Sequence, residues 1–204
     1  MDDDTCDLPA GAFGAWLAEA LAAIGGSGES DVPCGECTAC CRSAQFIHIA
    51  PDERDALAHI PTALLFPAPG APRGHMLMGY DEQGRCPMLV DDRCTIYAHR
   101  PHTCRVYDCR VFAAAGIDAD GPAVAEQARR WRFEHPTELD DVLHAAVRSA
   151  AEFVRDRSGD LPREAVPATA TQAAVAAVRT HRLFLRGGEP TPAEVAAAIT
   201  HRPR

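Results

Sequence analysis

Cysteines are concentrated in one stretch of this chain, and that concentration limits what the stretch can fold around. Eight of the nine cysteines lie between Cys34 and Cys109, and the first four read C-G-E-C-T-A-C-C. Crowded thiolates repel one another, oxidise readily and are seldom gathered without a soft cation to bind them. The sequence therefore predicts a metal or iron–sulfur site. Its candidate ligands are Cys34, Cys37, Cys40, Cys41, Cys86, Cys94, Cys104 and Cys109.

Length, composition and charge narrow the class of protein. The chain has 204 residues, of which 47% are hydrophobic, so it can bury a core without disulfide staples. Its formal net charge of −9 argues against binding to nucleic acid or to an anionic membrane surface. The acidic start M-D-D-D lacks the positive region of a secretory signal, and the apolar residues 10–24 are too few to span a bilayer. We therefore expect a cytoplasmic protein, in which four disulfides are the disfavoured alternative for the cysteines.

Hydrophobic periodicity and turn residues predict a mainly α fold with minor β structure. The expected helices are 10–24, 51–61, 122–134, 138–157, 163–185 and 192–200, and the expected strands are 45–49 and 75–80. The expected domains are 1–30 (an N-terminal helix and flexible linker), 31–112 (a cysteine-cluster metal-binding domain) and 113–204 (a helical C-terminal lobe). The architecture expected is a cysteine-rich, metal-binding loop segment braced by that helical lobe.

The spacing of the cysteines favours two sites over one. Cys34, Cys37 and Cys40 form two overlapping C-x2-C steps, a spacing used by four-cysteine zinc sites and by cubane iron–sulfur clusters. In bacterial ferredoxins a remote cysteine before proline, here Cys86, completes such a run. Cys41 would point away from Cys40 in an extended chain, although a helical turn would place both on one face.

Two partitions of these ligands follow from the spacing. The two-site hypothesis groups Cys34, Cys37, Cys40 and Cys86 in one site and Cys41, Cys94, Cys104 and Cys109 in the other. The alternative is a single site, in which some of the cysteines are buried as small apolar residues.

Arginine and histidine neighbours are candidates to complete the site. Five cysteines have an adjacent arginine, whose charge could offset that of a thiolate. These arginines are Arg42, Arg85, Arg93, Arg105 and Arg110. The alternative explanation is compositional, because the chain uses arginine in place of lysine throughout. His99 and His102 could each replace a thiolate, although ordinary surface positions are the favoured interpretation. Cys6 lies upstream in the acidic tail and is expected to take no part.

Two motifs give the chain a resemblance to a known family. The C-x2-C-x2-C-C run is followed by R-C-P-M-L and then by C-T-I-Y-A-H-R-P-H-T-C-R-V-Y-D-C. Together they resemble the YkgJ-type cysteine-cluster family (CxxCxxCC), described as zinc- or iron-chelating domains, over residues 34–110. The second run is similar to the family signature at Cys94, Ile96, Tyr97, Arg100, Pro101, Cys104, Arg105, Tyr107 and Cys109. The resemblance supports a common role for the eight cysteines.

Three functions fit these observations. The preferred one is a metal-binding protein that holds an iron–sulfur cluster, or zinc or iron ions, and has a structural, carrier or redox role. The second is a cluster-dependent modifying enzyme, because flagellin lysine N-methylases carry a similar cysteine pattern, which implies an iron–sulfur cluster linked to methyl transfer there. This chain is shorter than those enzymes and shows no glycine-rich phosphate-binding loop after a strand. The third is a thiol-based redox sensor that loses its metal on oxidation.

An iron–sulfur cluster is preferred over zinc or iron ions. The overlapping triplet with Cys86-Pro87 favours it, and the resemblance to the methylases points the same way. Tyr97, Tyr107, Arg100 and Arg105 are polar candidates for a reactive pocket, and the two arginines are expected to orient the metal ligands. The sequence assigns no catalytic residue and no protein partner.

Overall fold

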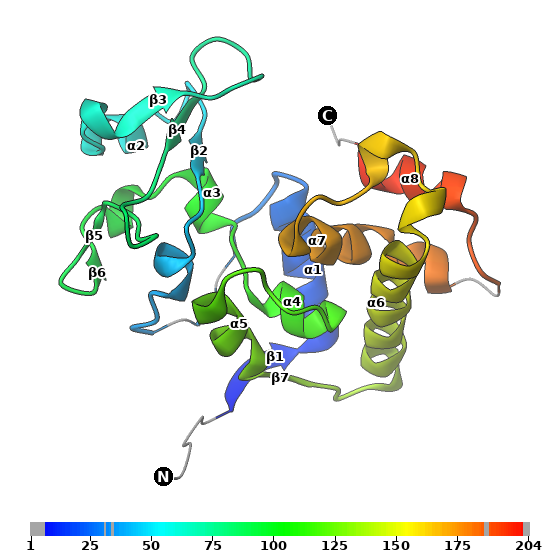
Figure 1. Ribbon diagram of the computed structural model, residues 1–204. Helices are drawn as coiled ribbons and strands as arrows, with labels where there is room; N and C mark the ends of the chain where they lie inside the picture. The colour runs from blue at the N-terminus through cyan, green and yellow to red at the C-terminus, as the bar shows by residue number, and fades with distance from the viewer. Residues whose placement is uncertain (1–6, 31, 34, 186–187, 202–204) are drawn as a thin grey trace. The chain divides into compact units, whose positions relative to one another are not determined.

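The computed structural model describes residues 7–30, 32–33, 35–185 and 188–201 and shows the predicted mainly α fold with minor β structure (Figure 1). The chain forms two compact units. The helical unit comprises Met1–Gly28, Asp108–Asp120 and Ala125–Arg204, and the cysteine unit comprises Glu29–Tyr107 and Gly121–Val124. In the described part of the chain, no helix has the length and apolarity to cross a membrane. The three-part division of the sequence remains a prediction.

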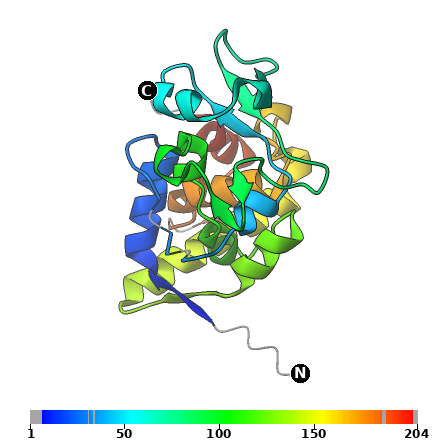
Figure 2. The ribbon, with the colours of Figure 1, turned by 90° about the vertical axis from the view of Figure 1, so that its left-hand side faces the viewer.

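The helical unit begins with a strand that leads directly into a helix. Strand β1 (Leu8–Ala12) is followed at once by helix α1 (Phe13–Ile24), as Figures 1 and 2 show. β1 pairs in parallel with β7 (Trp131–Glu134). The helix predicted for 122–134 was therefore wrong in its second half, because α5 (Pro122–Arg129) ends before β7. Pairing with a strand distant in sequence overrides the local helical pattern here.

Three C-terminal helices pack together in the helical unit. α6 (Glu138–Asp156) lies beside α7 (Ala170–Thr180), and α7 packs against α8 (Pro192–Thr200). α6 and α8 both start with a capping box, and the one at Thr191 and Glu194 confirms the predicted start of the last helix. The helix predicted for 163–185 is divided into shorter pieces, because proline interrupts the ladder of backbone hydrogen bonds before α7. One cluster of buried residues beside these helices consists of Phe153, Val154, Leu161, Ala165, Ala176, Val195 and Ala196.

A buried ion pair fixes the start of α4 (Arg110–Ala115) in this unit. Arg110 Nη2 lies 2.8 Å from Asp108 Oδ2, and the two side chains are 6% and 7% exposed. The indole N–H of Trp16 donates a second hydrogen bond to Asp108 Oδ2 at 2.9 Å, and Arg110 also donates to the carbonyl of Ala10 at 3.4 Å. Such a pair offsets its desolvation only when both charges are well hydrogen-bonded, as they are here.

His144 on α6 gives the helical unit a pH-sensitive contact. Its ring stacks on Phe13 with centroids 4.2 Å apart, and its two nitrogens bond to His135 (2.8 Å) and to the Ala114 carbonyl (3.2 Å). Burial, with smaller effects from the charges of Arg148 and His135, lowers the pKa of His144 from 6.5 to about 4. The folded state therefore favours the neutral ring, whereas the unfolded chain takes up a proton as the pH falls below 6.5.

We expect this histidine to weaken the fold in mild acid. A pKa shift of this size corresponds to at most about 3 kcal/mol of unfolding free energy. Because the ring is partly exposed, we expect the loss of unfolding free energy to be about 1–2 kcal/mol. The loss should develop between pH 6.5 and about 4. Urea unfolding across this range tests it, with His144→Gln as the comparison. A variant that loses as much stability over that range as the parent chain would assign the pH dependence to other groups.

The cysteine unit has its own small sheet and its own core. Strands β2 (Ile47–Ile49), β4 (Met76–Met78) and β3 (Leu65–Pro67) pair antiparallel in that order, and the strands predicted around β2 and β4 are confirmed. Helix α2 (Arg54–His59) follows β2, within the helix predicted there. The core residues are Ile49, Ala56, Ile60, Met78, Met88 and Ile96. Cys86 and Cys94 pack directly against this core, so two of the predicted ligands are part of it.

Candidate metal centre

The first group of cysteines forms a tight turn. The 3₁₀ helix η1 (Ala39–Arg42) carries Cys40 and Cys41, and the Cys41 N–H donates to the Thr38 carbonyl at 2.9 Å. The turn brings the two thiols into hydrogen-bond contact, so neither is directed away as an extended chain would require. The Cys86 N–H donates to the Cys41 carbonyl at 2.7 Å and thereby ties the second group to the first.

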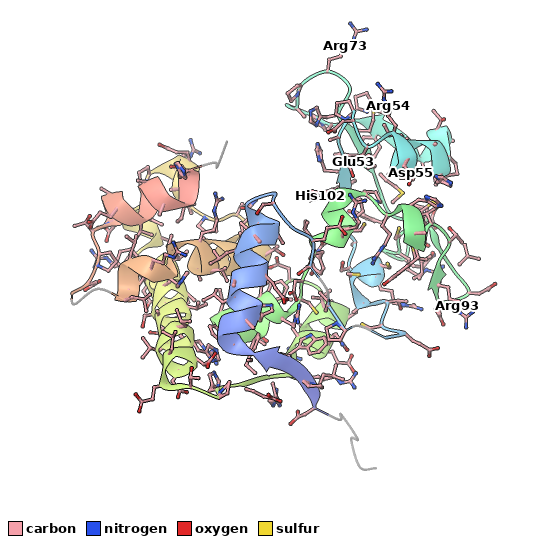
Figure 3. All side chains as sticks on the ribbon, turned by 180° about the vertical axis from the view of Figure 1, so that it is seen from behind. Glu53, Arg54, Asp55, Arg73, Arg93 and His102 are labelled. Carbon is pink, nitrogen blue, oxygen red and sulfur yellow. The ribbon has the colours of Figure 1, made fainter. Side chains whose placement is uncertain are left out.

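A short hairpin presents the second group. β5 (Leu89–Val90) and β6 (Arg93–Cys94) pair antiparallel, with Leu89 opposite Cys94. Asp91 and Asp92 make the two-residue turn with φ of 47° and 58°, a left-handed conformation that aspartate tolerates better than most residues. Figure 3 labels Arg93 at this hairpin. The Leu89 N–H donates to the Cys86 carbonyl at 2.9 Å, which makes a backbone turn between Cys86 and the start of the hairpin.

Helix α3 (His102–Arg105) places the third group. The Cys104 N–H donates to the Pro101 carbonyl at 2.9 Å, and the Thr103 hydroxyl donates to the His48 carbonyl of β2 at 2.7 Å. The Cys104 thiol interacts through charge with the thiols of Cys40, Cys86 and Cys94. The same three thiols interact with Cys41. The five-thiol cluster consists of Cys40, Cys41, Cys86, Cys94 and Cys104.

The thiols of the five-thiol cluster shift one another's pKa values. The hydrogen bond from Cys41 lowers the pKa of the Cys40 thiol to about 7, although burial opposes the shift. The same bond raises the pKa of Cys41, with burial and the neighbouring thiols acting in the same direction. Burial, followed by the negative charges of its neighbours, raises the pKa of Cys104 to about 12, and burial also raises that of Cys86. A metal that binds the raised-pKa thiols at neutral pH must displace their protons.

Comparison with known proteins gives one family match, and it covers the segment that carries these cysteines. Residues 33–130 match the model of the family CxxCxxCC, whose description is "Putative zinc- or iron-chelating domain". This segment of the chain is a CxxCxxCC domain. Comparison with curated proteins and with solved structures gives no match. The matched segment contains all eight predicted ligands and extends beyond the last of them through α5.

The remaining cysteines of the CxxCxxCC domain have different surroundings. Cys37 is half-buried and its sulfur accepts from the Ala39 N–H at 3.5 Å, next to the η1 turn. Cys109 belongs to the helical unit, where it is buried and accepts a hydrogen bond from the Trp131 indole N–H at 3.2 Å. Cys34 and Cys6 lie outside the described residues. Charge interactions thus connect five of the eight predicted ligands, although in the described part of the chain no three cysteine sulfur atoms lie within 4.8 Å of one another. Cys37 and Cys109 have other surroundings.

Most arginines adjacent to cysteines pair with carboxylates. Four such arginines form these pairs. They are Arg42 with Asp92, Arg85 with Asp81, Arg105 with Glu29 and Arg110 with Asp108. The positive charge that lowers the pKa of cluster thiols is instead that of Arg100, which acts on Cys40 and Cys104. Adjacency in sequence was therefore a poor guide to which arginine faces a thiol, because neighbouring side chains diverge.

The side chain of Glu53 holds the segments around the cluster, a role that sequence reasoning missed. Its Oε2 accepts from the Ala50 N–H at 2.7 Å, and its Oε1 accepts from the His102 N–H at the start of α3. Figure 3 labels Glu53 and His102 on these neighbouring segments. The sequence suggested only that Glu53 lies near a helix start. No local pattern could have revealed a partner so distant along the chain.

Proposed function

We propose that the five-thiol cluster is the centre of an iron–sulfur site in a metal-binding protein with a structural, carrier or redox role. The observation that carries the proposal is the charge interaction among thiols from three separate chain segments, two of which, Cys86 and Cys94, pack on one small core. Four of the five are half-buried and one is exposed, so the site combines a water-poor interior with access for an incoming metal. Thiolate is the donor that soft metals and iron–sulfur clusters select.

Several observations favour iron–sulfur over a single zinc ion. Five thiols interact with one another, more than the four that one tetrahedral zinc takes. The overlapping C-x2-C steps with Cys86-Pro87 also resemble a ferredoxin run. When bound, such a cluster would supply one-electron redox chemistry. The protein's own contribution would be the Arg100 charge and the backbone bonds that keep Cys41 beside Cys86. Cys34 and Cys37 complete the proposed ligand set by their spacing.

Metal binding is expected to release protons and to weaken as the pH falls. Because the pKa values of Cys41, Cys86 and Cys104 are raised, these thiols keep their protons at neutral pH until metal displaces them. For each proton that the metal displaces, the apparent metal affinity should fall about tenfold when the pH is lowered by one unit. Zn²⁺ or Fe²⁺ added anaerobically to metal-free protein in weak buffer, with an indicator dye, measures the release. Cys104→Ser should release fewer protons, and binding without proton release would contradict the proposed ligands.

A second candidate function, thiol-based redox sensing, is favoured by one observation. Within the five-thiol cluster, Cys40 has the thiol whose pKa is lowered, to about 7, by its contact with Cys41. Hydrogen peroxide would convert the Cys40 thiolate to a sulfenic acid with release of hydroxide. A second thiol of the cluster would then form a disulfide with it and release water, and the metal would lose two ligands.

The sensor function predicts a reversible loss of metal. One equivalent of hydrogen peroxide should release the metal, and a dithiol reductant should allow it to rebind. Peptide mass spectrometry of the oxidised parent chain should find a disulfide that includes Cys40, a readout that does not need a variant of a metal ligand. Irreversible loss of metal, or loss of metal while Cys40 stays reduced, would exclude a switch based on Cys40.

A further inference from the structure

Two histidines and an aspartate meet on the surface of the cysteine unit. Asp55 and His59 lie on α2, and His99 lies on the 3₁₀ helix η3 (Tyr97–His99). Each offers one ligand atom, and the three atoms lie within 4.8 Å of one another. His99 Nδ1 is 2.8 Å from Asp55 Oδ2, and the rings of His59 and His99 stack with centroids 3.5 Å apart. In the part of the chain that the structure describes, this is the one group of three or more such side chains this close together.

The donor set differs in kind from the five-thiol cluster. Two imidazole nitrogens and one carboxylate oxygen suit borderline divalent ions such as Zn²⁺, Co²⁺, Ni²⁺ and Fe²⁺, whereas thiolates select softer metals and clusters. Two ligands about 2.1 Å from one zinc ion are at most about 4.2 Å apart. The triad can share an ion when the stacked rings of His59 and His99 turn so that their in-plane lone pairs meet at one point. The Asp55 side chain is 68% exposed and those of His59 and His99 are about 40% exposed, so water can fill the remaining coordination positions.

The backbone holds this triad in place without a metal. His59 Nδ1 donates to the Asp55 carbonyl at 2.8 Å, which fixes that ring on α2. Glu53, directly before α2, bonds to the start of α3 at His102, three residues beyond His99. Figure 3 labels Glu53, Asp55 and His102 in this region. The hydrogen bond from His99 also lowers the pKa of Asp55, which keeps its carboxylate ionised and able to bind a cation.

We propose that Asp55, His59 and His99 form a second, solvent-open site for a divalent transition-metal ion, separate from the cysteine ligands. The ion replaces the proton shared by His99 and Asp55 and keeps water in its open positions. The site does not depend on the identity of the metal at the thiols, because it uses none of the cysteines.

Cobalt titration of the full chain, purified anaerobically with its own metal, tests this site. We expect a further equivalent of Co²⁺ to bind with weak visible absorption and without sulfur-to-cobalt charge transfer. His59→Gln and His99→Gln should each weaken this binding at least tenfold, since even the loss of a group outside the ligand shell costs about 10–100-fold. His75→Gln is the matched control, because His75 forms another histidine pair in the same unit, at 2.9 Å from His48, and it should leave Co²⁺ affinity unchanged.

Each outcome of the titration decides the proposal. If no Co²⁺ binds beyond the thiols, or if His59→Gln and His99→Gln bind it as tightly as the control His75→Gln, the triad is only an ion pair with a stacked ring. Charge transfer from sulfur would assign the added metal to the cysteines and also overturn the proposal. Circular dichroism and the content of the metal acquired during expression show whether His59→Gln and His99→Gln are folded, and both should match the parent chain. Asp55→Asn, which keeps the shape of the side chain, should weaken Co²⁺ binding in the same way.

Discussion

Replacement of Cys86 by serine is expected to remove most of the metal from the protein. Cys86 interacts with Cys40 and Cys94, its backbone is bonded to Cys41, and its side chain packs on the core of the cysteine unit. The loss of one directly bound thiolate should lower metal affinity by more than the 10–100-fold typical of an outer partner, leaving less than about a tenth of the metal under competition with a chelator. Elemental analysis after anaerobic purification measures it.

Two other cysteines provide controls for this variant. Cys6→Ser should leave the metal content unchanged. Cys109→Ser should reduce metal less than Cys86→Ser does, because Cys109 lies in the helical unit with Trp131 as its hydrogen-bond donor. If Cys86→Ser retained full metal content, or if Cys6→Ser lost half of it, the proposed ligand set would be wrong.

Asparagine in place of Asp108 is expected to give the largest loss of stability. The change leaves the Arg110 guanidinium buried and opposite a neutral amide, and it weakens the bond from the Trp16 indole. Removing one member of a buried pair costs about 3–5 kcal/mol, a large share of the 5–15 kcal/mol that stabilises a typical domain. Urea unfolding followed by circular dichroism measures the loss.

An exposed pair in the same unit is the matched control. Asp118 bonds to Arg129 at 3.3 Å, and the two side chains are 80% and 64% exposed. Asp118→Asn should change the unfolding free energy by less than about 1 kcal/mol. In the double variant Asp108→Asn with Arg110→Met, removal of the unpaired charge should restore part of the stability. Equal effects of Asp108→Asn and Asp118→Asn would show that the buried pair has no special role.

Local patterns in the sequence predicted much of the fold. Periodicity identified α6, and the sequence Thr191-Pro192-Ala193-Glu194 identified the start of α8, because caps depend on neighbouring residues. The sequence did not predict that residues 131–134 form β7, because that strand exists only by pairing with β1. Contacts between distant segments are invisible to a local pattern.

The candidate site was predicted by residue type but not by arrangement. All five members of the five-thiol cluster are among the ligands predicted from the sequence. The two-site hypothesis separates Cys40 from Cys41, whereas the two thiols are in contact in a 3₁₀ turn. It also suggested charge compensation by arginines such as Arg85, which pairs with Asp81. The triad of Asp55, His59 and His99 required the tertiary proximity of α2 and η3, although His99 alone had been a candidate ligand.

The central claim is that the five-thiol cluster holds an iron–sulfur cluster, and one measurement tests it most directly. The full chain is purified without oxygen, its iron, zinc and acid-labile sulfide are determined, and its visible spectrum is recorded. We expect a brown protein that contains iron and sulfide together and absorbs in the visible through sulfur-to-iron charge transfer. A colourless protein with stoichiometric zinc and no sulfide would contradict the claim for iron–sulfur, and a folded protein without metal would contradict metal binding itself.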